Sequence, residues 1–286
     1  MVQGCNPCAK DFRYMDMLRA CELTMHMLEY VKDLLTHVDS MSKSGRVFPF
    51  RSRYKHIERV TERALRICAA EGGDFGIIAP AAIFHDSGYY YSGEGHALRS
   101  AKIFKDYINR RVNAQSELSE ISDARRQSTP PEKTSAFPQA APPEKISAFP
   151  QFTPSKNAED SPHSLLTSAV YRAVASESAL IRICDTISAH SNKNLPDHLL
   201  SLESRILMDA DLLDETGAMA ILFDCFFETE SPAYDYVSAY NRISERYSAW
   251  TDENVFFHTD EGKRLFLKAR RYAGEYIVGL KDELGL

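Results

Sequence analysis

The 286-residue sequence lacks several features that would each define a broad class of protein. It has no surplus of basic residues, since its net charge is −6, so its composition does not favour nucleic acid as a partner. It has no apolar run long enough to span a membrane, and charged residues stand where a signal peptide would need an apolar core. We therefore expect a soluble cytoplasmic protein that binds neither nucleic acid nor membrane.

Cysteine is also scarce, and the six cysteines are scattered along the chain. Several lie in apolar helical patterns, which favours reduced core residues over a disulfide framework. Cys5 and Cys8 form a CxxC motif, but neither a second CxxC nor a flanking βαβ pattern accompanies it. We read this motif as an incidental pair.

Alternation of apolar and polar residues with period two is never sustained for long enough to predict a β-sheet. Apolar residues recur instead every three and four positions, which predicts amphipathic helices. The predicted helices span 12–39, 51–71, 77–85, 96–112, 165–175, 177–190, 201–214, 217–227, 232–249 and 260–284. The fold class is therefore all-α, a helical bundle.

Residues 113–163 interrupt this helical pattern. The segment is rich in Ser, Pro, Ala and Gln, and PPEKTSAFPQ at 130–139 recurs as PPEKISAFPQ at 142–151. Two copies are too few for a solenoid, and the prolines oppose regular helix. We expect a disordered insertion with polyproline character, either a duplicated passenger loop or a docking segment for a protein partner. The chain then divides into a helical extension at 1–47, one domain at 48–112 and 164–284, and the insertion.

A buried apolar run, Ala81 to Phe84, ends in His85 and Asp86. Taken alone, this pair can be a helix end at which Asp86 caps and His85 bonds a carbonyl. Ionisable residues recur, however, on other apolar helix faces, at His56, His96, His190 and Asp211. Each would bear its own desolvation penalty, whereas a shared divalent ion satisfies all of them, because imidazole and carboxylate are common metal ligands. The sequence therefore predicts a metal site.

The order of these residues resembles the HD-domain superfamily of metal-dependent phosphohydrolases. The matching segments are RYKHIERV at 53–60, AAIFHDSGY at 81–89, HALRSA at 96–101, ISAHS at 187–191 and DADLLDETGA at 209–218, with a tail at 259–271 that is similar to compact single-domain members. The resemblance covers residues 48–284 apart from the insertion. Ser87, Gly88 and Tyr89 stand where the alarmone-hydrolase branch has acidic residues, which argues against that branch, and the HD-GYP signature is absent.

The resemblance implies that His56, His85, Asp86 and Asp211 are metal ligands. In members with two metals, Asp86 would bridge the ions, and His96 and His190 would hold the second one. His96 follows Asp86 unusually closely, so these two histidines could alternatively bind phosphate or supply a general acid. The ion would be Mn, Fe, Ni, Co or Zn, with Mg also compatible, and one or two ions could bind.

The implied activity is hydrolysis of a phosphate ester or anhydride of a nucleotide or another small phosphorylated metabolite. A divalent ion would lower the pKa of a bound water to about 7 and polarise a phosphoryl oxygen. Arg53, Arg59 and Arg99 lie near the histidines and could bind the substrate phosphate, or they could belong to a solvated basic surface. The tyrosines at 89–91 could stack on a base or sugar at the mouth of the site.

Two acidic residues flank Asp211. Asp209 or Asp214 could orient a ligand histidine, or either could cap a helix. Two other functions stay open at this point: a di-iron HD-fold oxygenase, which would need both His96 and His190 as ligands, and a non-catalytic HD sensor or binding module. The sequence also leaves open whether the chain forms a homodimer.

Overall fold

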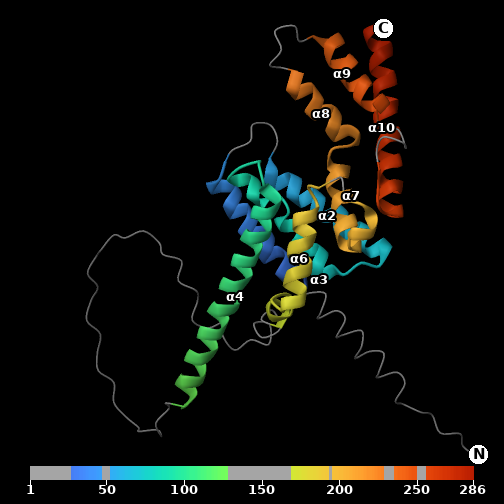
Figure 1. Ribbon diagram of the computed structural model, residues 1–286. Coiled ribbons are helices and arrows are strands. Elements are labelled where there is room, and N and C mark those ends of the chain that lie inside the picture. Colours follow the sequence, from blue (N-terminus) through green and yellow to red (C-terminus); the bar gives the residue numbers. More distant parts are fainter. Residues whose placement is uncertain (1–26, 47–51, 128–168, 193–194, 229–234, 250–255) are drawn as a thin grey trace, which may run out of the picture.

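The computed structural model describes residues 27–46, 52–127, 169–192, 195–228, 235–249 and 256–286, which form an assembly of packed helices (Figure 1). Their order is a helix over 27–44, α2 (Arg53–Glu71), α3 (Phe75–Phe84), the 3-10 helix η1 (Ser87–Tyr90), α4 (His96–Gln127), a helix over 169–174, α6 (Glu177–Ala189), the 3-10 helix η2 (Asp197–Leu199), α7 (Leu202–Asp214), α8 (Gly217–Glu228), α9 (Tyr236–Ala249) and α10 (Asp260–Leu284). The described residues contain no β-strand, which confirms the all-α prediction.

Local capping sets the ends of α2 and α3. The Ser52 side chain accepts a hydrogen bond from the backbone of Lys55 and begins α2, and Gly72 ends it with a φ of 75°. Asp74 then caps α3 through the backbone of Gly76. The short turn folds α3 back against α2, so that His56 and His85 can meet.

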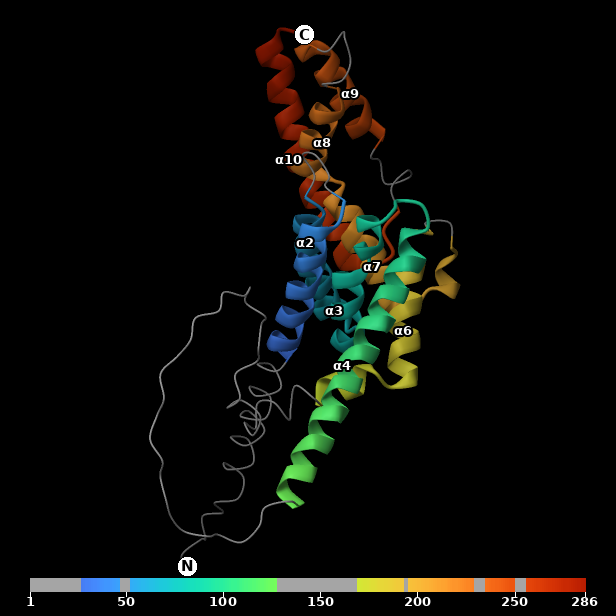
Figure 2. The same cartoon turned by 90° about the vertical axis from the view of Figure 1, so that its left-hand side faces the viewer.

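The main core lies where α2, α3 and α7 pack together with the helix over 27–44, α4 and α6. The predicted inward residues Ile57, Val60 and Ala64 of α2 are fully buried there. A second, smaller cluster joins α8, α9 and α10 through Ile221, Ile243 and Ile277. In Figure 2 these three helices form a separate group at one end of the main core.

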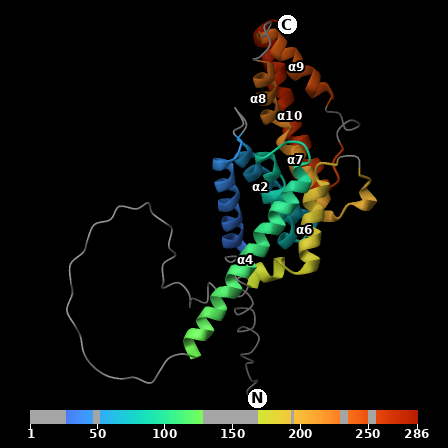
Figure 3. The same cartoon turned by 60° about the vertical axis from the view of Figure 1, so that its left-hand side comes forward.

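α4 and α6 lie side by side although the predicted insertion separates them in sequence (Figure 3). Asp33, in the helix over 27–44, accepts hydrogen bonds from Tyr107 Oη at 2.9 Å and from Arg111 Nη2 at 2.6 Å. Its carboxylate also accepts from Tyr171 Oη. Asp33 therefore ties together the helices before and after the insertion, and the core is continuous across it.

Two predicted boundaries are wrong. Helix α4 continues to Gln127, so residues 113–127 of the predicted insertion are helical; this stretch contains neither Pro nor Gly, and the first proline comes at Pro130. The first helix continues past its predicted end to residue 44, and the hydroxyls of Ser40 and Ser42 there bond carbonyls one turn earlier within the helix. Residues 12–26, the CxxC motif and the two repeats lie outside the described residues.

Within the described part of the chain, no helix combines the length and the apolar character needed to cross a membrane.

Candidate metal centre

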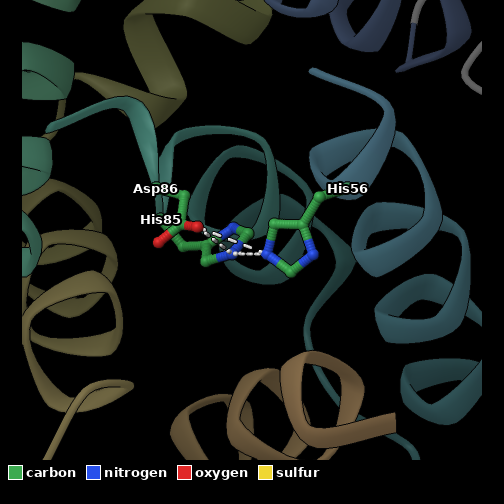
Figure 4. A group of neighbouring side chains, drawn as sticks. All are labelled: His56, His85 and Asp86. Atoms are coloured by element: carbon green, nitrogen blue, oxygen red, sulfur yellow. Dashed lines mark hydrogen bonds and ion pairs between the residues drawn. The ribbon is translucent and has the colours of Figure 1, made fainter. Parts of the chain in front are cut away.

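The six predicted ligands meet at one place, although they come from five helices. Most lie at or near helix ends: His56 near the start of α2, His85 and Asp86 directly after α3, His96 at the start of α4, His190 directly after α6, and Asp211 near the end of α7. Figure 4 shows His56, His85 and Asp86 pointing toward one another. His56, His85, Asp86 and His190 are each at most 3% exposed.

The first cluster consists of His56, His85, Asp86 and Asp211. His56 Nε2 lies 3.2 Å from His85 Nε2 and 3.3 Å from both Asp86 Oδ2 and Asp211 Oδ1. His85 Nε2 lies 3.8 Å from the same two carboxylate oxygens. Ligand atoms about 2.0–2.2 Å from a common ion can be at most about 4.4 Å apart, so these separations fit one metal site.

The second cluster consists of Asp86, His96 and His190. The other oxygen of Asp86, Oδ1, lies 3.5 Å from His96 Nε2 and 3.6 Å from His190 Nε2, and the two nitrogens are 3.2 Å apart. These three residues also form a group that could hold a metal ion. The short sequence gap before His96 is therefore no obstacle, and the two oxygens of Asp86 face two different clusters, as a bridging carboxylate would.

All four histidines are oriented in the same way. In each, Nδ1 donates a hydrogen bond away from the centre, from His56 to Asp214 Oδ2 at 2.7 Å, from His85 to Ala82 O at 2.7 Å, from His96 to Gly93 O at 3.0 Å and from His190 to Ile187 O at 2.5 Å. A carbonyl can only accept, so Nδ1 carries the proton in His85, His96 and His190, and Nε2 of all four rings faces the centre. Inward Nε2 atoms and carboxylates this close together can share either a histidine proton or a bound cation, and imidazole with carboxylate is a common ligand set, so the residues present fit a divalent metal.

Electrostatics point the same way. Burial opposes a charge on His56, but its hydrogen bonds to Asp211, Asp214 and Asp86 outweigh burial and raise the pKa of His56 to about 10. Burial also opposes ionisation of Asp86, yet the adjacent His85 and the hydrogen-bonding histidines hold the pKa of Asp86 well below its usual value. The pKa of Asp211 is lowered too, because its contacts with His56 outweigh burial. The carboxylates are therefore ionised, and the site attracts cations.

Of the two acidic residues that flank Asp211, Asp214 is the one that bonds a predicted ligand histidine. Its buried carboxylate accepts a hydrogen bond from His56 Nδ1. It also accepts two from Arg59, one from Nε at 2.7 Å and one from Nη2 at 2.8 Å. Arg63 Nη1 bonds the same carboxylate. Arg59 was predicted to bind a substrate phosphate, but it donates two hydrogen bonds to Asp214 instead. Arg63 was missed, although its spacing of four residues from Arg59 places both on one face of α2.

Asp209 does not orient a ligand histidine, contrary to one prediction for it. Its buried carboxylate accepts from the backbone of His258 at 2.9 Å and of Thr259 at 2.8 Å, and from Thr259 Oγ1 at 2.6 Å. It therefore anchors the chain at the start of α10.

Arg53 lies at the edge of the two clusters. Its Nη1 donates to Asp86 Oδ2 at 2.8 Å, and its guanidinium lies 3.9 Å from the ring centre of Tyr89. The Tyr89 ring in turn packs on His96, with ring centres 4.0 Å apart. Tyr89 is therefore held between Arg53 and His96, and it fixes Arg53 beside the predicted metal ligands.

Arg99 does not face the clusters, contrary to the prediction that it binds phosphate. Its guanidinium donates to the carbonyls of Gly88, Ser92 and Glu94 at 3.0 to 3.3 Å. A Cβ on Gly88 would overlap the backbone carbonyl of His96, so glycine allows this loop to lie against the start of α4. Arg99 and Gly88 thus help to position His96.

The family model described as "HD domain" matches residues 53–216, which contain both clusters. Among solved structures, Bacillus subtilis YpgQ is 17% identical, with a TM-score of 0.48, and the match covers 90% of this chain and 96% of that one. YpgQ in complex with ADP matches with a TM-score of 0.47 at 17% identity, over 90% of this chain and 96% of that one. The Lin1889 protein from Listeria innocua is 15% identical with a TM-score of 0.46, over 90% and 98% of the two chains. A comparison with curated proteins gives no match.

Proposed function

Because this chain belongs to the HD-domain family, we propose that it is a metal-dependent phosphohydrolase that cleaves a phosphate ester or anhydride of a nucleotide or another small phosphorylated metabolite. The observation that supports this most is the pair of clusters sharing Asp86, with every histidine Nε2 directed inward. A buried group of acceptors of this kind is expected to bind divalent ions and to leave positions for water and substrate oxygens.

The residues present define which groups would hold the ions. His56, His85, Asp86 and Asp211 would hold one, and Asp86, His96 and His190 the other. The imidazole content favours Mn, Fe, Ni, Co or Zn over Mg. A divalent ion bound there supplies an acidified water and a positive charge opposite the phosphoryl oxygens.

Arg53 is the described arginine best placed to hold the substrate phosphate. It is 14% exposed in its side chain, stacked on Tyr89 and already bonded to the carboxylate that both clusters share. When cations neutralise Asp86, the guanidinium is freer to bind a phosphate oxygen at the same place. Arg59 and Arg99 take no part, since Asp214 and the loop carbonyls occupy them.

The test is metal analysis of the purified protein coupled to a phosphate- and pyrophosphate-release screen over nucleotides and small phosphorylated metabolites. We expect bound divalent metal and release from at least one substrate class, with His85→Ala losing both. His258→Ala is the matched control, because His258 bonds Asp197 outside the two clusters. Metal-loaded protein that releases nothing from the whole panel would refute the proposal.

A second candidate is a di-iron oxygenase, which the second cluster favours because His96 and His190 do converge on Asp86. It requires iron in both positions. Elemental analysis with spectroscopy of the mixed-valence iron pair distinguishes the two functions, and a site filled with manganese or nickel would exclude the oxygenase. A homodimer, and a protein partner for the repeated segment, stay predictions.

A further inference from the structure

Asp214 connects the first metal cluster to a groove on the surface of the protein. The groove has a volume of about 600 Å³ and lies between α2, the junction of α7 with α8, and α10. Figure 1 shows α10 running beside α7 and α8. No residue of either metal cluster lines it.

One wall of the groove carries three arginines. Arg59, Arg63 and Arg66 project from α2 at intervals of four and three residues, which places them on one face of the helix. Their side chains are 31%, 27% and 55% exposed. Arg59 and Arg63 share the single carboxylate of Asp214, which His56 also bonds. Arg66 pairs with Glu261 Oε1 at 3.3 Å, and the exposed Glu62 also lines the groove, so a bound anion would compete with these carboxylates for the guanidinium groups.

The other wall is largely apolar. It contains Met219, Leu265 and Ala269, and the half-exposed ring of Tyr272 stands at the same wall. A volume of about 600 Å³ lies within the range of small-molecule sites, roughly 300–1,000 Å³, and is larger than a lone anion requires. The two walls together match a molecule with a phosphate at one end and a flat or apolar group at the other.

We propose that this groove binds a small organic phosphate of mononucleotide size as a second site, separate from the metal centre. Arg66 holds the phosphate, because its pairing with Glu261 involves a 55% exposed side chain and a phosphate oxygen can replace that carboxylate. Arg63 adds charge from the same face of α2 while it stays bonded to Asp214. Tyr272 and Leu265 cover the apolar end of the ligand. The site goes beyond the proposed hydrolysis and does not depend on it.

Occupancy of the groove is transmitted to the metal centre through Asp214. An anion there offsets the positive charge of Arg59 and Arg63, so Asp214 becomes a stronger acceptor for His56 Nδ1. A stronger acceptor makes His56 Nε2 a better metal ligand. Ligand in the groove therefore raises metal affinity, and metal raises ligand affinity by the same factor.

The test uses AMP as the probe, with the full-length protein and calorimetry in the presence of chelator. We expect saturable AMP binding that Arg66→Glu weakens at least tenfold. Arg172→Glu, which changes an exposed arginine on the helix over 169–174, outside the groove lining, should leave it unchanged. His85→Ala should retain AMP binding. If His85→Ala does not fold, Asp211→Asn serves as the variant of the metal centre.

Coupling is measured as Mn²⁺ affinity with and without saturating AMP. We expect about a fivefold increase with AMP in the wild-type protein and none in Arg66→Glu. Absence of saturable AMP binding, AMP binding that Arg66→Glu leaves intact, or AMP binding that His85→Ala abolishes would overturn the proposed site. An Mn²⁺ affinity that AMP leaves unchanged would overturn the proposed coupling. Metal content and phosphate release without AMP test the proposed hydrolysis separately, so either idea can fail alone.

Discussion

Replacing Asp214 with asparagine tests how the first cluster is built. The Asp214 carboxylate is fully buried and accepts four hydrogen bonds, one from His56 and three from two arginines. Burial opposes ionisation, but these arginine and histidine contacts hold the pKa of Asp214 well below its usual value. The asparagine substitution would keep the shape of the side chain while removing its charge and one acceptor oxygen.

Two losses are expected from Asp214→Asn. Removing an outer partner of a metal-ligating histidine lowers metal affinity about 10- to 100-fold. The lost bonds to Arg59 and Arg63 lower the free energy of unfolding by about 1–3 kcal/mol, toward the lower end because both arginines are about 30% exposed and water can replace part of the interaction.

Asp209→Asn is the matched control. Asp209 lies on the same helix and is equally buried, yet it bonds His258 and Thr259 rather than a metal ligand. We expect a similar loss in urea unfolding, about 1–3 kcal/mol, with Mn²⁺ affinity within twofold of wild type in a chelator-competition titration. Equal losses of metal affinity in the two variants would mean that Asp214 acts through general stability, and wild-type affinity in Asp214→Asn would remove its role altogether.

Three further predictions concern the same site and its surroundings. His96→Ala should reduce the metal content from two ions to one. Gly88→Ala should have the same effect, because the added Cβ would displace His96. Elemental analysis measures both variants, and two retained ions would contradict the second metal site. Metal-free protein should lose stability as the pH rises from about 6.5, the pKa of histidine in the unfolded chain, to about 10, the pKa of His56 in the folded protein, because the stabilising charge of His56 is lost over this range. Bound metal should remove this dependence. Thermal melts at pH 7 and pH 9 compare the metal-free and metal-bound proteins. Deleting residues 130–151 should leave metal content and helicity unchanged, since the described helices on either side contact each other directly, and loss of either would show that the repeats support the fold.

Much of the helical fold could be predicted from local patterns. The apolar positions of α2 at spacings of three and four are its buried positions, and Gly72 ends the helix where the sequence indicated. The misplaced end of α4 has a local cause as well, because a polar segment without Pro or Gly continues a helix for as long as nothing stops it. The insertion was predicted from its average composition, which concealed its helical first part.

Helical spacing could have distinguished the two acidic residues that flank Asp211. Asp214 follows Asp211 by three residues and shares its face of α7, whereas Asp209 precedes it by two and points elsewhere. Helical geometry alone therefore favoured Asp214 as the partner of a ligand histidine. It could not identify His56 as that ligand, because α2 and α7 are brought together only by packing.

The sequence by itself determined the helices and the set of candidate metal-ligating residues, because periodicity and ligand chemistry are local properties of the chain. Only the tertiary structure decided which of those residues contact one another. It directs one oxygen of Asp86 to each cluster, pairs Arg53 with Asp86, and assigns Arg59 and Arg63 to Asp214. The physical reason is that a long side chain such as arginine reaches several partners, and only the packing of distant helices determines which carboxylate lies within hydrogen-bonding distance.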